Sequence, residues 1–81
     1  MSDTLIRLAS QLAEDVVAAM KEMDDERFFT EVAQVISASS QSLEEAFLTE
    51  VRIRMTEKQA RNFLDRRLAE FRASQPATME R

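Results

Sequence analysis

The chain contains no glycine, and its only proline is Pro76. Residues 1–75 therefore lack the two residue types that most readily interrupt a helix. Tight hairpin turns and left-handed helix caps favour glycine, and phosphate-binding loops are built around it. This composition predicts an all-α chain and excludes P-loops and glycine-rich dinucleotide-binding motifs.

Apolar side chains recur at helical spacing in several segments. Ser2 or Asp3 is suited to cap the first helix, and the acidic residues 24–26 to cap the second. Ser42 and Glu45 have the spacing of a capping box at the start of a third helix. We predict helix over residues 4–73, with connections near residues 23–25, near residues 37–42 and at Thr56.

The connection at Thr56 follows from a change of helical phase. At about 100° per residue, one apolar stripe forms before Thr56 and a second, centred roughly opposite, forms after it. The first stripe comprises Phe47, Leu48, Val51 and Met55, and the second comprises Ala60, Phe63, Leu64, Leu68 and Phe71. A break at Thr56 would turn both stripes toward one core, and we favour it. The alternative is a continuous helix that bridges two subunits.

The segment 51–55 also alternates apolar residues with Arg52 and Arg54, as a β-strand would. In this respect the segment resembles the opening of a ribbon-helix-helix DNA-binding domain, with the sequence VRIRMTEKQARNFLDRRL over residues 51–68. The resemblance implies that Arg52 and Arg54 contact bases in the major groove. The family also requires a second helix, for which only ten residues remain after Phe71.

The residue types that carry most enzyme chemistry are scarce. The chain has no histidine and no cysteine, so the usual general bases, thiol nucleophiles and Glu-x-x-His metal pairs are absent. Neighbouring carboxylates such as Glu14 and Asp15 point in different directions on a helix. We therefore expect a non-enzymatic protein without a cofactor or a metal site.

Charge is unevenly distributed along the chain. Residues 1–50 carry a net charge of −8, and residues 51–81 carry +4. Such asymmetry favours complementary packing within or between chains, although it also fits a basic nucleic-acid contact region. The total of −4 makes nucleic-acid binding the less favoured interpretation.

The predicted first helix has more apolar surface than one partner helix would cover. One line contains Leu5, Leu8, Leu12 and Val16, and a second contains Ile6, Ala9, Ala13, Val17 and Met20. We predict that the second line packs against another protein chain, most simply its own counterpart in a homodimer. Residues 1–75 would form a single helical domain, a small bundle of three to four helices with hairpin-like connections, completed by dimerisation. Residues 76–81 would form a flexible tail.

The favoured function is a small protein–protein interaction module, such as an adaptor, a chaperone-like binder or an inhibitor, that acts as a helical homo-oligomer. No apolar run reaches the length of a membrane span and no secretory leader is evident, so we expect a cytoplasmic protein without membrane contact. The alternative is a small nucleic-acid-associated regulator. Its contacts would come from the arginines of the 52–72 segment, namely Arg52, Arg54, Arg61, Arg66 and Arg67.

Overall fold

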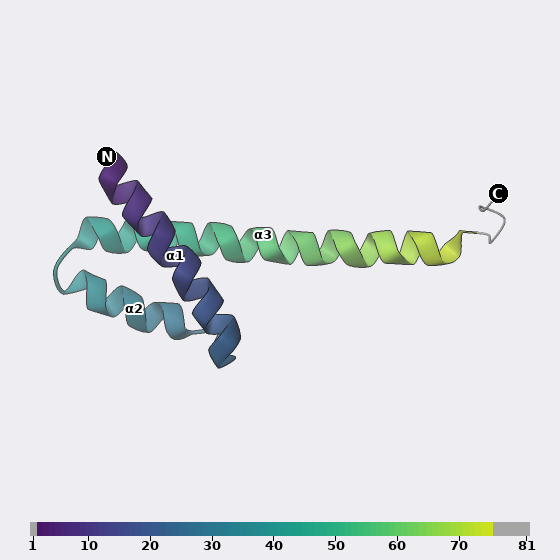
Figure 1. The fold of residues 1–81 in the computed structure, drawn as a ribbon, viewed down its shortest axis with the longest axis horizontal. Coiled ribbons are helices and arrows are strands. Elements are labelled where there is room, and N and C mark those ends of the chain that lie inside the picture. Colours follow the sequence, from purple (N-terminus) through teal and green to yellow (C-terminus); the bar gives the residue numbers. More distant parts are fainter. Residues whose placement is uncertain (1, 76–81) are drawn as a thin grey trace.

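The computed structural model describes residues 2–75, of which most are helical (Figure 1). The three helices are α1 (Asp3–Met23), α2 (Phe28–Ser37) and α3 (Gln41–Ser74). The predicted all-α class is confirmed, as are the connections near residues 23–25 and 37–42. The predicted tail, residues 76–81, lies outside the described residues.

The ends of α1 are set by side-chain and backbone capping. The Ser2 hydroxyl accepts a hydrogen bond from the Leu5 amide at 3.0 Å, as predicted for this cap. At the other end Asp24 has a left-handed backbone, with φ of 56°, and the Asp25 amide donates to the Met20 carbonyl. A glycine would adopt this conformation at lower cost, but the chain has none.

The helices that follow are capped differently from the prediction. The Asp25 carboxylate accepts from the Arg27 amide at 3.0 Å, so the acidic run organises the turn before α2 without capping the helix itself. Helix α3 is capped by Ser40, whose hydroxyl accepts from the Leu43 amide at 3.1 Å. The predicted cap Ser42 is wrong, because this residue already lies inside the helix.

Helix α3 is continuous over 34 residues, which corresponds to a length of about 50 Å. The predicted break at Thr56 is therefore wrong, and the strand interpretation of residues 51–55 is wrong as well, since this segment is helical. Without glycine or proline, nothing forces the backbone to give up its helical hydrogen bonds at Thr56. The continuous helix, which was the alternative, gives the molecule an elongated shape of 61 × 28 × 13 Å.

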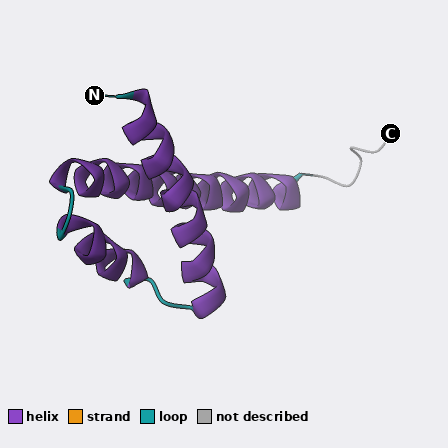
Figure 2. Cartoon of the chain, turned by 60° about the vertical axis from the view of Figure 1, so that its left-hand side comes forward, coloured by secondary structure: helices purple, strands orange, loops and turns teal. Residues whose placement is uncertain are grey.

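The core lies where α1 crosses the first half of α3, with α2 packed alongside (Figures 1 and 2). We call this part, residues 2–55, the head. It contains a small group of buried side chains: Ala9, Ala13, Val16, Met20, Ala33, Phe47 and Val51. Residues 56–74 extend past the head as the second half of α3, and we call this segment the arm (Figure 1).

Candidate interaction surfaces

The first candidate surface is the predicted partner-binding line on α1. Ala9 and Ala13 are fully buried and Met20 is 8% exposed, all within the chain itself. Val17 is partly buried, and only Ile6 is clearly exposed, at 43%. In this fold a second chain therefore cannot reach the side chains of Ala9, Ala13 and Met20. Their small or flexible side chains instead serve the packing of α1 inside the head.

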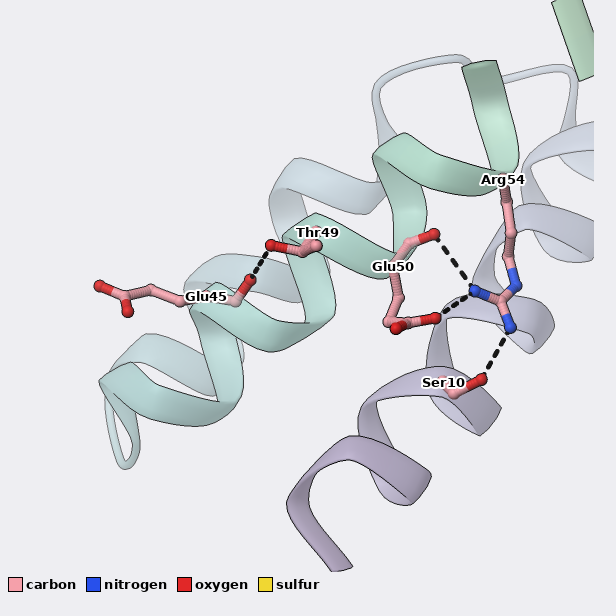
Figure 3. A network of polar contacts seen from close by, with 5 residues as sticks. All are labelled: Ser10, Glu45, Thr49, Glu50 and Arg54. Carbon is pink, nitrogen blue, oxygen red and sulfur yellow. Dashed lines mark hydrogen bonds and ion pairs between the residues drawn. The ribbon is translucent and has the colours of Figure 1, made fainter. Parts of the chain in front are cut away.

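A polar contact reinforces the crossing of α1 and α3 (Figure 3). The Arg54 guanidinium donates to the Ser10 hydroxyl on α1 at 2.8 Å and to the Glu50 carboxylate at 2.6 Å. It also donates to the Glu50 carbonyl at 3.2 Å. The Arg54 and Glu50 side chains are 28% and 23% exposed, so the ion pair is partly shielded from water. Arg54 therefore has a structural role at the crossing.

The other arginines predicted as nucleic-acid contacts are dispersed along α3. Arg61 pairs with Glu57 at 2.7 Å, and the hydrogen bond together with the attraction of this carboxylate raises the pKa of Arg61 above its ordinary value. Arg67 lies 3.5 Å from Glu70, and Arg66 stacks over the Phe63 ring at 5.6 Å.

Arg52 is exposed and, among residues 2–75, takes part in no ion pair. At about 100° per residue, Arg52 and Arg54 lie on different sides of α3, and the arginines of the arm are spread around the helix as well. The set therefore does not form one basic face of the kind that follows a nucleic-acid backbone.

An open hollow of about 340 Å³ lies between the C-terminal end of α1 and the start of the arm. Its lining combines the apolar residues Val17, Met20 and Met55 with exposed groups of both charges, among them Lys21, Asp24, Glu26 and Lys58. No polar side chain is buried in the described part of the chain. Within this part of the chain, the hollow therefore contains no buried polar group with a fixed orientation. Nor do residues 2–75 contain a cluster of three or more carboxylate, histidine or cysteine side chains that could hold a metal ion. The hollow has the character of a groove between helices.

The second candidate surface is an apolar stripe on the arm and the adjoining turn of α3. It consists of Ile53, Ala60, Phe63, Leu64, Leu68 and Phe71, and we call it the arm stripe. Ile53, Phe63, Leu64 and Phe71 are between 53% and 59% exposed, and Leu68 is 37% exposed. Every residue of the arm is exposed, so neither α1 nor α2 covers the arm stripe.

The sequence predicts most of these residues as one apolar stripe, but the prediction that they face the core is wrong. The helical spacing of Ala60, Phe63, Leu64, Leu68 and Phe71 is present as predicted, but the stripe faces away from the core because α3 does not bend. Ile53 joins it, since at about 100° per residue it lies on the same side as Leu64 and Phe71. The two stripes have opposite helical phase, and no helix breaker lies between them. Together these two features indicate a straight helix with one apolar stripe left exposed.

A search against protein-family models, curated proteins and solved structures found no match to the chain. Within residues 2–75, no helix combines the length and the apolar character that a membrane crossing would need.

Proposed function

We propose that this protein is a protein–protein interaction module that works as a helical homodimer, with the arm stripe as its contact surface. The observation that carries the proposal is the exposure of five large apolar side chains along one side of the arm and its adjoining turn. Contiguous apolar surface of this kind is typical of interaction sites, whereas single exposed apolar residues are common on any protein. The head acts as a small folded base from which the arm projects.

The proposed role also explains how the arm can remain helical. An isolated helix of this length is only marginally stable in water, and most helices in proteins are stabilised by packing of an apolar face. The arm continues from the folded head, so its helix does not have to nucleate, but its apolar face has no partner within residues 2–75. A second helix against the arm stripe would supply the missing contact.

The size of the exposed stripe indicates a modest affinity. Burying the exposed half of each large side chain contributes roughly 1 kcal/mol, or about 10 kcal/mol for the five positions on both arms. Association costs about 4 kcal/mol or more in lost translational and rotational freedom. The difference of about 6 kcal/mol corresponds to a dissociation constant of about 40 μM, which suits a reversible interaction.

Sedimentation equilibrium with two matched variants tests the proposal. Leu64→Glu places a charge in the middle of the arm stripe, whereas Ala69→Glu places the same charge on the opposite face of the arm, where the side chain is also exposed. We expect a dimer for the wild-type chain and for Ala69→Glu near 100 μM, and a monomer for Leu64→Glu. A monomeric wild-type chain at this concentration, or equal dimerisation of both variants, would contradict the proposal.

A further inference from the structure

Deepening the proposed function, on which this inference rests, we propose that a second copy of the chain covers the arm stripe in antiparallel orientation, with the two-fold axis level with Asn62. The head of each copy would then lie at an opposite end of the paired arms. Four observations support this arrangement: the symmetry of four apolar positions, the charges that flank them, a hollow on the same face of the head, and the distribution of net charge along the chain.

Four of the six positions of the arm stripe are arranged symmetrically about residue 62. With the axis at this level, Ile53 faces the partner's Phe71, and Ala60 faces the partner's Leu64. All four positions lie within about 40° of one another around the helix, so they share the centre of the contact face. The small side chain of Ala60 opposite a leucine permits close approach of the two helices. Phe63 and Leu68 flank this central line on either side.

The charges beside the stripe are complementary in the same register. In an antiparallel pair related by a two-fold axis, side chains on the same flank of the two helices meet. Arg52 and Glu70 share one flank, and in this register Arg52 comes within about 3 Å along the axis of the partner's Glu70. Arg72 lies on the other flank, near the partner's Glu50, but the Glu50 carboxylate already pairs with Arg54 at 2.6 Å, so the register rests on the Arg52–Glu70 pair. By symmetry, the Arg52–Glu70 pair occurs twice in the dimer.

The tip of each arm would end at an open hollow on the partner's head. This hollow, of about 330 Å³, is lined by Ile6, Glu45, Ala46, Thr49 and Glu50. Ala46 and Thr49 lie on the same side of α3 as the arm stripe. In the proposed register Thr49 lies level with the partner's Gln75, at the end of the described chain. Ile6, the exposed member of the line predicted on α1, would take part in this contact.

Net charge favours antiparallel over parallel pairing. Residues 1–50 carry −8, whereas residues 51–75 carry +4. A parallel dimer would bring the two acidic regions together at one end, where they repel. The antiparallel dimer separates them and places each one near the basic arm of the other copy.

Engineered cysteines test the orientation, because the chain has no cysteine of its own. We would oxidise Ile53→Cys chains, Phe71→Cys chains and an equal mixture of the two, and detect covalent dimers on non-reducing gels. In the proposed dimer position 53 faces position 71 of the partner, while equivalent positions are about 27 Å apart. A disulfide requires Cα atoms within about 7 Å. We therefore expect efficient cross-linking only in the mixture.

Other outcomes overturn the arrangement. Efficient cross-linking of Ile53→Cys chains with each other would indicate parallel arms, and no cross-linking in a mixture that still forms dimers would refute the register. Either result leaves the proposed function intact if Leu64→Glu still abolishes the dimer. A monomeric wild-type chain would instead refute the proposed function itself.

A charge exchange tests the register without altering the apolar contacts. Arg52→Glu should weaken the dimer about fivefold, since two flanking pairs are lost, and adding Glu70→Arg should restore most of the affinity. Lys58→Glu is the matched control, because it makes the same change of charge on the opposite side of the arm. Equal weakening by Arg52→Glu and Lys58→Glu, or no restoration in the double variant, would overturn the proposed register.

Discussion

Substitution of Ala13 by glutamate tests whether the head is held together as the structure shows. Ala13 is fully buried in a cluster that includes Phe47 and Val51, and no polar side chain is buried in the described chain. A glutamate at this position would have no hydrogen-bond partner among the buried side chains. It would have to remain charged in an apolar environment, bind a proton, or push the helices apart.

The expected destabilisation is large compared with the total stability. Buried glutamates can have a pKa 3 to 4 units above the ordinary value near 4.3, and because such a group is largely protonated at pH 7, its penalty at that pH is about 3.5 kcal/mol. The added volume contributes roughly 1 to 3 kcal/mol more. A chain of 81 residues is typically stable by only about 4 to 12 kcal/mol. We therefore expect Ala13→Glu to be largely unfolded, or to melt tens of degrees lower than the wild type.

Thermal unfolding followed by circular dichroism measures this effect, and Ala18→Glu is the control. Ala18 lies on the same helix and is exposed, so the same substitution should change stability by less than about 0.5 kcal/mol there. Because the folded state raises the pKa of the new carboxyl group, the penalty is complete only above the folded-state pKa, shrinks as the pH falls between the two pKa values, and is lost near the unfolded-state value of about 4.3. The difference between the two variants should therefore narrow when the pH is lowered from 7 to 4.5.

Two results would refute this account of the head. If Ala13→Glu melted within a few degrees of Ala18→Glu, the packing of α1 against α3 through Ala13 would be wrong. If the difference between the variants grew with protein concentration, Ala13 would contact another chain, as the sequence-based prediction held. Intrachain packing requires that the difference be independent of concentration.

Three further sets of substitutions test local features of the head by thermal or chemical unfolding. Ser40→Ala should cost about 1 kcal/mol by removing the cap of α3, whereas Ser42→Ala should be nearly neutral; the reverse order would contradict the observed helix start. Asp24→Gly should stabilise the protein by about 0.5 to 1 kcal/mol, because glycine tolerates the left-handed backbone; a loss of stability would mean that the carboxylate contributes more than the strain costs. Arg54→Ala should cost about 1 kcal/mol, and a double-mutant cycle with Ser10→Ala should show coupling between the two side chains; additive effects would indicate that their hydrogen bond is not formed in solution.

The sequence correctly predicts the all-α fold class and two of the three connections, because local interactions determine both. Nothing in residues 1–75 breaks a helix as glycine or proline would, and the caps at Ser2 and Ser40 depend on neighbours within three residues. The cap of α3 was misplaced from Ser40 to Ser42 because a serine-rich connection offers several possible caps. Only the final backbone geometry distinguishes them.

The positions of the surfaces depend on long-range packing, which the sequence specifies less directly. The phase change at Thr56 was correctly identified, but a bent helix and a straight helix with one exposed stripe both satisfy that pattern. Similarly, Ala9 and Ala13 indicate a close helix contact without indicating whether the other helix belongs to the same chain. In the structure α3 supplies that contact, and the excess apolar surface lies on the arm.

Because α3 is one unbroken helix, residues can be inserted into it or deleted from it without disturbing the arm stripe only in certain numbers. Inserting one residue between the head and Ala60 would rotate the rest of the arm by about 100° relative to the head, and so separate Ile53 from Leu64 and Phe71. Seven or eleven added residues would change the direction of the stripe by only about 20°, because they are close to a whole number of helical turns. Functional variants of this chain should therefore differ in arm length by such steps, and single insertions should be tolerated only in the two loops of the head.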